Sequence, residues 1–445
     1  MKFLDIVIRA GTLLFVFLIP WQARLIIAEG SINGQYWEYG TQSLYATEVL
    51  LFVVLIAVVA KGAASVLARK PGFSMRRLAP PAGAFVVFLA WAGVSILWSV
   101  DRGVALEHWL ALVSGVAVFL ILASGAASFS RLSWAIIISG SIQAILAFVQ
   151  FRLQEVGGST WLGMAFQHAS VLGTSVVETD MMRMLRAYGS FPHPNILGGW
   201  LVLGLLLAVK ETAWRGRRGA FAPLAYVAVA VLSTGLAVTF SRSAWLAFGV
   251  GFAVYVLIAL IRLPRSLRSL AMTFVVIVLF AGTLIISYPE PFKERVFGGG
   301  RLEVKSYEER SSGISEAWQL IKQHPIAGVG IGNYGLAVHR DIDASQPAYY
   351  YQPVHAVPLL VMAELGIIGL IFVLGFLYFV LSSRHPGRSE PAASGVEGSR
   401  WLSAGVFLLP LAILALFDHY LWSLYSGMMI GVVYLAIFYL KLAKI

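Results

Sequence analysis

Apolar residues gather along the chain into long runs, each about the length that a helix needs to cross a bilayer. A membrane-spanning helix takes about 20 mostly apolar residues. About twelve runs meet this requirement, with ends defined only to within a few residues. They lie near residues 5–22, 42–60, 81–98, 104–124, 133–152, 195–210, 221–239, 244–262, 268–288, 355–382, 401–417 and 421–440. The pattern predicts an all-α integral membrane protein with about twelve transmembrane helices.

Two segments between these runs, residues 153–194 and 289–354, are too long to be simple connections. Long ordered loops are usually functional. We therefore expect nine transmembrane helices within residues 1–288, a separate loop domain at 289–354, and three more transmembrane helices at 355–445. The loop domain is predicted to carry a short helix from about Ser311 to just before Pro325, followed by a glycine-rich turn.

Composition supports a lipid-solvated bundle over a large soluble core. Of the 445 residues, 59% are hydrophobic and only 12% are charged, and a soluble domain has about twice that charged fraction. The 43 glycines suit close packing between membrane helices. Because the chain has no cysteine, disulfides, thiol nucleophiles and thiolate metal sites are excluded.

The net charge of +11 is compatible with nucleic acid or with anionic lipid as a partner, and its distribution favours lipid. With the loops assigned alternately to the two sides, 19 Lys and Arg residues fall on the side of the N-terminus, 13 fall on the other side, and Arg9 lies within the first run. Seven of those 13 belong to the long loop at 289–354, and long loops count little in the positive-inside rule. We therefore expect two cytoplasmic termini, long loops outside, and no nucleic-acid partner.

Arg242 is placed where membrane energetics disfavours a cation. It lies between two apolar runs with almost no loop around it. A charge at bilayer depth costs about 2.5–3.5 kcal/mol on insertion scales, so such a residue usually has a functional partner. The alternative is an interfacial turn whose arginine reaches the headgroups.

The predicted topology also turns three helix N-termini outward, near residues 195, 244 and 355. Helix N-termini carry partial positive charge and free N–H groups. Arg186 and Arg242 stand beside two of them, and Asn195 is a plausible N-cap. Together these features would suit a ligand that bears phosphate.

His355 is the best candidate for a general base. A helix N-terminus and neighbouring arginines both lower the pKa of a histidine, because they disfavour its cation. A neutral imidazole can accept a proton near neutral pH. The alternative is a histidine that caps or anchors the helix at the membrane interface.

Other polar residues are weaker candidates. Asp341 and Asp343 have the spacing of a metal-binding pair, but a solvated turn explains them better. Asp418 and His419 fit a polar hairpin between two apolar runs, and His193, between two prolines, fits a structural role.

Three of these segments together resemble a known family. Residues 239–247, residues 310–334 and residues 355–369 are similar, in order and spacing, to the signatures of the O-antigen ligase and polymerase superfamily. The resemblance covers about 240–370, and residues 186–199 are similar to the outer loop that precedes these signatures. Each motif alone is weak, and the ordered set is fairly specific.

The resemblance implies an enzyme with a fold like that of lipid-carrier-dependent (GT-C-like) glycosyltransferases. Such enzymes move a glycan from undecaprenyl pyrophosphate to an acceptor, and ligases use lipid A–core oligosaccharide. By resemblance, Arg186, Arg242 and Arg310 would contact the pyrophosphate, and His355 would activate the acceptor hydroxyl. No cofactor is implied, and we expect three fixed cations to replace a metal ion. The site would face the periplasm from the bacterial inner membrane.

Two departures from the family pattern concern fine positioning. Ala356 stands where a polar residue commonly follows the histidine, and Leu370 replaces a frequent threonine.

The choice within the superfamily favours a ligase. Polymerases often carry an arginine followed by ten residues and a glycine in two outer loops, and neither Arg186 nor Arg301 fits that pattern. Polymerase, protein O-oligosaccharyltransferase and, from another class, membrane transporter remain the alternatives.

Overall fold

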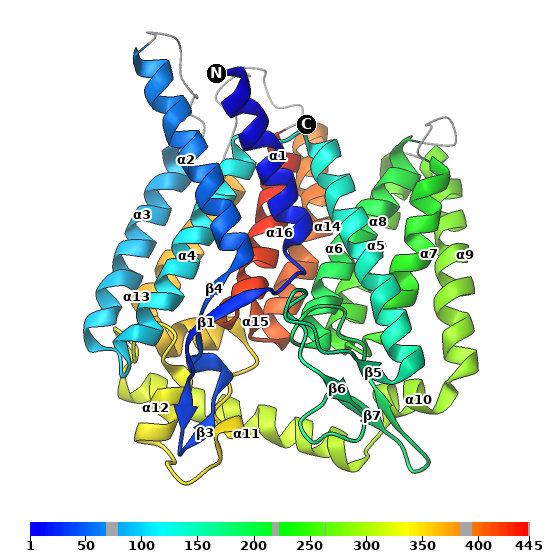
Figure 1. The fold of residues 1–445 in the computed structure, drawn as a ribbon. Coiled ribbons are helices and arrows are strands. Elements are labelled where there is room, and N and C mark those ends of the chain that lie inside the picture. Colours follow the sequence, from blue (N-terminus) through cyan, green and yellow to red (C-terminus); the bar gives the residue numbers. More distant parts are fainter. Residues whose placement is uncertain (68–78, 216–221, 263, 383–393, 444–445) are drawn as a thin grey trace.

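The computed structural model of the protein describes residues 1–67, 79–215, 222–262, 264–382 and 394–443. Long helices form a bundle, with both chain termini at one end and the strands and connecting helices at the other (Figure 1). We call this second end the loop end. The helices are α1 (Lys2–Leu18), α2 (Ala46–Leu67), α3 (Ala79–Val94), α4 (Arg102–Ala123), α5 (Phe129–Leu153), α6 (Pro194–Arg215), α7 (Ala222–Val238), α8 (Arg242–Arg262), α9 (Pro264–Ser287), α10 (Pro289–Phe297), α11 (Arg301–Gln323), α12 (Tyr334–Asp341), α13 (Val357–Ser382), α14 (Ser394–Phe417), α15 (Tyr420–Ser423) and α16 (Tyr425–Ala443).

Short antiparallel strand pairs lie at the loop end. The first pair joins β1 (Arg24–Ala28) to β4 (Gln42–Tyr45), and the second joins β2 (Ser31–Ile32) to β3 (Gln35–Tyr36). We call residues 24–45 the N-terminal hairpin. The loop between α5 and α6 pairs β5 (Glu155–Val156) with β6 (Gln167–His168), and β7 (Val176–Glu178) with β8 (Arg183–Leu185).

Each of the twelve predicted apolar runs overlaps a helix. Among the described residues, seven helices are long and apolar enough to cross a membrane, and four shorter apolar helices accompany them. The membrane protein class is therefore supported, and the number of crossings stays a prediction. Residues 42–45 begin the second predicted run but form strand β4, because they pair with β1.

Helix α11 is longer than predicted. It begins at Arg301, ten residues before the predicted start, and it ends at Gln323, before Pro325 as expected. Its first turns are rich in charged residues and so carry no apolar run. Glu303 in these turns is nevertheless buried, and it forms the ion pairs described below. Helix α11 runs across the loop end and connects α10 to α12 (Figure 1).

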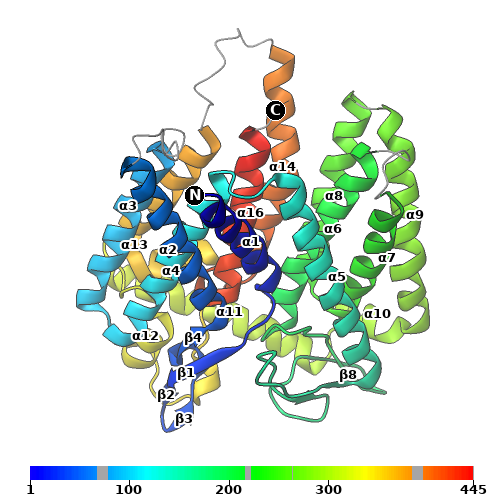
Figure 2. The ribbon, with the colours of Figure 1, turned by 45° about the horizontal axis from the view of Figure 1, so that its top comes forward.

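Helix α6 is the most enclosed of the candidate membrane spans. Along its apolar stretch 94% of the residues are buried, whereas the other six candidate spans have 17–50% of theirs buried. It packs against α5, α7, α8, α9, α14 and α16, as the tilted view also shows for its nearest neighbours (Figure 2). The start of α6 is therefore held firmly at the loop end.

Helix α13 is interrupted at Gly366, which has φ +69° and ψ −171°. An interrupted helix leaves backbone groups without intrahelical partners. The glycine-rich segment before α12 supplies those partners: the N–H groups of Val329 and Gly330 donate to the carbonyls of Ala363 and Glu364, at 3.0 and 2.8 Å. The predicted glycine turn thus binds the break in α13.

Two glycines permit this close approach. A Cβ on Gly366 would lie 2.0 Å from the Ile326 carbonyl oxygen, and a Cβ on Gly328 would lie 2.3 Å from the carbonyl carbon of Glu364. The buried Glu364 carboxylate then fixes the neighbouring segments, since it accepts hydrogen bonds from the Gly332 N–H at 2.9 Å and the Trp422 indole at 2.7 Å.

Gly366→Ala is expected to destabilise the protein by at least about 2 kcal/mol, because alanine disfavours positive φ and its Cβ would meet backbone. Thermal unfolding of the detergent-purified protein measures this loss. Gly375→Ala is the matched control, because Gly375 lies in the same helix with open space around its Cβ position. Equal unfolding temperatures for the two variants would contradict the interpretation.

Candidate functional site

Arg186, just after β8, is a buried cation that bonds only to neutral groups. Its side chain donates from Nε to the Thr239 carbonyl at 2.9 Å and from Nη2 to Asn195 Oδ1 at 2.5 Å. The residue is 6% exposed, and no carboxylate pairs with it in the described parts of the chain. Burial, and then the nearby Arg295, lower the pKa of Arg186 below its usual range. An anionic ligand would relieve the cost of this unpaired charge.

The turn between α7 and α8 is held by two guanidinium groups. Its Thr239 carbonyl accepts from Arg186, and its Phe240 carbonyl accepts from Arg295 Nε at 2.7 Å. These carbonyls stand at the C-terminus of α7, where a helix carries partial negative charge and favours cations. Phe240 has φ +49°, uncommon for a bulky residue. Its fully buried ring packs on Phe292, with ring centroids 4.7 Å apart.

Arg242, the first residue of α8, is part of an ion-pair cluster. Its Nη1 lies 3.0 Å from a Glu303 carboxylate oxygen, and Arg295 pairs with the other oxygen of the same carboxylate. Arg242 also donates to the Tyr307 hydroxyl at 3.0 Å, with its guanidinium 5.2 Å from that ring centre. Since two guanidiniums share one carboxylate, this cluster keeps a net positive charge. Arg242 is therefore held by a carboxylate and a hydroxyl of α11, which an arginine that only extends toward lipid headgroups would not require.

Arg310 follows Glu303 on α11 by two helical turns. It makes no hydrogen bond or ion pair with any residue that the structure describes. Its charge contributes to the lowered pKa values of Arg295 and His355, so it lies within electrostatic reach of both. The predicted cations therefore converge on one region, with Arg295 as a fourth that the sequence analysis did not single out.

His355 lies between η5 (Ala348–Tyr350) and α13 and opens on a cavity of about 150 Å3. Burial lowers the pKa of His355, and Arg310 lowers it further against the opposing effect of Asp418. The direction agrees with the sequence-based expectation, although burial is the main cause. His355 makes no side-chain hydrogen bond in the described parts of the chain. The cavity is lined by Glu38, Tyr39, Pro192, His193, Ile196, Gln352, His355, Asp418, His419, Tyr420 and Leu424.

Asp418 faces the same cavity and is 3% exposed. Its two oxygens accept from the His419 backbone N–H at 3.0 Å and from Asn195 Nδ2 at 2.6 Å. Burial raises the pKa of Asp418, but its electrostatic interactions with the neighbouring His355, His419 and His193, together with the Asn195 hydrogen bond, lower it. A buried carboxylate thus stands beside the candidate base, where the sequence indicated only a polar hairpin. Its position between two apolar runs was the available signal.

His419 and His193 complete the polar wall of the cavity. Burial lowers the pKa of each to about 3, so both rings are neutral. His419 contacts Ser423 Oγ at 2.6 Å and the Tyr39 hydroxyl at 3.4 Å. His193 Nδ1 accepts from the Asn195 backbone N–H at 3.1 Å, so its proton resides on Nε2. His193, for which a structural role was expected, also lines the cavity.

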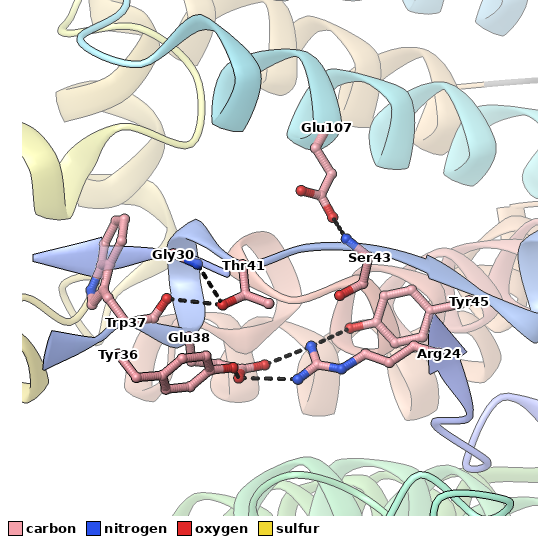
Figure 3. A network of polar contacts seen from close by, with 9 residues as sticks. All are labelled: Arg24, Gly30, Tyr36, Trp37, Glu38, Thr41, Ser43, Tyr45 and Glu107. Carbon is pink, nitrogen blue, oxygen red and sulfur yellow. Dashed lines mark hydrogen bonds and ion pairs between the residues drawn. The ribbon is translucent and has the colours of Figure 1, made fainter. Parts of the chain in front are cut away.

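The N-terminal hairpin covers one side of the cavity with Glu38 and Tyr39. Figure 3 shows the Arg24 guanidinium between Glu38, to which it donates at 2.8 and 3.1 Å, and the Tyr45 hydroxyl at 3.4 Å. Glu107 of α4 accepts from the Ser43 N–H at 2.8 Å and so ties the hairpin to the bundle. These contacts keep the Glu38 carboxylate at the cavity wall.

His355, Asp418 and His419 have the donor types of a metal site, with donor atoms within 4.8 Å of one another. Most of these donors are already engaged, because both Asp418 oxygens and both His419 ring nitrogens have polar partners. Arg310 adds a positive field that opposes a cation. This arrangement fits proton transfer better than metal binding, and the metal independence expected from the sequence stays a prediction.

A comparison with protein families assigns the region that carries much of this site. Residues 227–374 match the family model described as O-antigen ligase. This segment of the chain is therefore similar to the O-antigen ligase family. No curated protein matches the chain.

The O-antigen ligase match covers about a third of the chain. It includes Arg242, Arg310, His355 and the interlocked break in α13. The loop that carries Arg186 and the turn that carries Asp418 lie outside it, and only the tertiary structure brings them to the matched region.

Glu303→Gln is expected to lower the free energy of unfolding by about 3 kcal/mol, because it leaves two guanidiniums without their shared counter-charge. Chemical or thermal unfolding in detergent measures this effect. Glu308→Gln on the exposed side of the same helix serves as control and should change stability by less than about 0.5 kcal/mol. A stable Glu303→Gln variant would show that the cluster does not hold α11 in place.

Proposed function

We propose that the protein is a glycosyltransferase that moves O-antigen polysaccharide from undecaprenyl pyrophosphate to a sugar hydroxyl of lipid A–core oligosaccharide. The observation that carries this proposal is the pairing of two unlike features at the loop end of a chain that is similar to the O-antigen ligase family. One is Arg186, a buried cation with neutral partners only. The other is the cavity in which a neutral histidine faces a carboxylate.

The reaction is a single displacement. The acceptor oxygen attacks the anomeric carbon, and a new glycosidic bond forms as the bond from that carbon to the pyrophosphate oxygen breaks. The acceptor proton passes to His355, and undecaprenyl pyrophosphate leaves with the bonding electron pair. Attack opposite the leaving group inverts the anomeric configuration.

Arg186, Arg242 and Arg310 stabilise the charge that grows on the leaving pyrophosphate. Donors fixed in place before the reaction supply the electrostatic effect that is usually largest in catalysis. Arginine suits this role because its planar group binds phosphate oxygens in pairs and stays protonated. In this scheme Arg242 contacts the pyrophosphate while Glu303 limits its charge. Three fixed cations make a metal ion unnecessary.

Asp418 stabilises the imidazolium that His355 becomes. A carboxylate beside a histidine favours its cation, and Asp418 raises the pKa of His355 in this way. His193 offers a fixed N–H donor for a sugar or phosphate oxygen. The N-terminal hairpin, with Glu38 and Tyr39, lies where the acceptor sugar would enter.

The proposal places the chain in a bacterial inner membrane, with the termini in the cytoplasm and the loop end in the periplasm. Polymerase and protein O-oligosaccharyltransferase activity use the same donor chemistry and remain alternatives within the superfamily. A transporter, the alternative from another class, would need polar binding groups near the bilayer midplane, whereas the cavity and the arginines described above lie at the loop end.

Lipopolysaccharide banding tests the proposed function directly. Cells that lack their own ligase receive the wild-type chain, His355→Ala, or the control His168→Ala, which changes a half-buried histidine of β6 that does not line the cavity. Wild type and the control should restore the long-chain ladder, whereas His355→Ala should lose at least about 100-fold of the activity expected from a general base. If wild type fails with its native donor and acceptor supplied, a polymerase or transporter function is favoured.

The pH profile should reflect His355. The base must be neutral, so activity is present above the pKa of His355 and is lost as the pH falls through it. Because the pKa of His355 is lowered, the acidic midpoint of kcat/KM should lie below about 6.5. Arg310→Gln removes a cation that lowers this pKa, so it should move the midpoint upward. A wild-type midpoint above 6.5 would contradict the assignment.

A further inference from the structure

Asn195 joins the two charged parts of the site. It lies in the first turn of α6, where its side-chain oxygen accepts from Arg186 at 2.5 Å and its side-chain nitrogen donates to Asp418 at 2.6 Å. All three residues are at most 6% exposed. Asn195 was expected to cap the helix, but its side chain instead connects a cation to an anion.

An amide is suited to this position. Its oxygen accepts and its nitrogen donates, so it satisfies a guanidinium at one end and a carboxylate at the other without carrying charge. A carboxylate at residue 195 would pair with Arg186 and repel Asp418. An apolar side chain there would leave each of these two buried charged groups short of one hydrogen-bond partner, which is costly.

Arg186 and Asp418 would otherwise be natural partners for each other. Opposite charges in a poorly solvated environment attract strongly, and direct contact would cancel much of the field of each. The cation would then have less charge to offer a pyrophosphate, and the carboxylate would have less charge to offer an imidazolium.

We propose that Asn195 is a positioning residue that holds the Arg186 cation and the Asp418 carboxylate apart. Arg186 is then free to act on the donor pyrophosphate, and Asp418 is free to act on the base His355. This inference rests on the proposed glycosyl transfer. Arg186 faces the charge that develops on the leaving pyrophosphate, and Asp418 faces the charge that develops on His355. No proton passes through Asn195, because the acceptor proton ends on the His355 ring.

The position of Asn195 on α6 supports this role. Helix α6 is the most enclosed candidate membrane span, so packing on all sides fixes the position of Asn195 in its first turn. The Asn195 backbone N–H also fixes the tautomer of His193. The titratable and charged groups that act on His355 or share its cavity are Asp418, His419, Tyr420 and His193, Arg310 and Glu309 of α11, and Glu38 and Tyr39 of the N-terminal hairpin.

Asn195→Ala tests this positioning role in the full-length, detergent-purified protein with carrier-linked donor and lipid acceptor. With the two charges free to pair, kcat should fall about 10–100-fold, by the strength of hydrogen bonds to charged groups. The KM for the donor should rise, and the acidic midpoint of the pH profile should move down as Asp418 acts less on His355. Asn333→Ala is the matched control, since it removes another buried asparagine that bonds to backbone groups near Asp101. It should cost stability without moving the pH midpoint.

The double variant Asn195→Asp with Asp418→Asn separates positioning from packing. It keeps the total charge and leaves a donor or acceptor for every hydrogen bond, so it should fold as well as wild type. Its carboxylate, however, now pairs directly with Arg186 and no longer faces His355. We expect a stable protein with kcat at least about 100-fold below wild type.

A fully active double variant would overturn the proposal, because Asn195 and Asp418 would then matter only for packing. Wild-type kcat and an unchanged pH midpoint in Asn195→Ala would overturn it as well. Failure of the proposed function gives a different result, because the wild-type chain itself would then transfer no glycan. The role proposed for Asn195 would be rejected together with that function.

Discussion

Charge that is buried away from water is the constraint on which the loop end depends. An unpaired buried ion is costly, and the structure meets that cost in three ways. Arg186 bonds to a carbonyl and an amide, Glu303 is shared by two arginines, and Asp418 accepts from an amide and a backbone N–H. Each arrangement fixes a side chain, and together they connect α6, α8, α11 and the turn after α14.

The helices around these charges provide the rigidity that such a site needs. Side chains are positioned most precisely when they stand on firmly packed elements. Asn195 begins the most enclosed candidate span, and His355 stands two residues before α13, whose break at Gly366 is bound by the glycine-rich segment. The segments 324–334 and 363–369, which resemble the family signatures, therefore bind each other through backbone hydrogen bonds.

Sequence reasoning succeeded where the signal is local. Apolar runs predicted the helices, the prolines and glycines near 325–332 predicted the end of α11 and the turn after it, and the family motifs indicated the superfamily. It failed at the start of α11, because residues 301–310 carry charge and lack an apolar run. It also failed at residues 42–45, where pairing with β1 outweighs the apolar pattern.

The sequence by itself determined the membrane class, the helical segments and four residues of interest: Arg186, Arg242, Arg310 and His355. Hydropathy is a property of neighbouring residues, so it can be read along the chain. Only the tertiary structure decided what surrounds these residues, since Asn195 meets Asp418 across 223 positions and Arg242 meets Glu303 by the folding back of α11. Contacts between charges depend on how distant segments pack, and no local pattern encodes that arrangement.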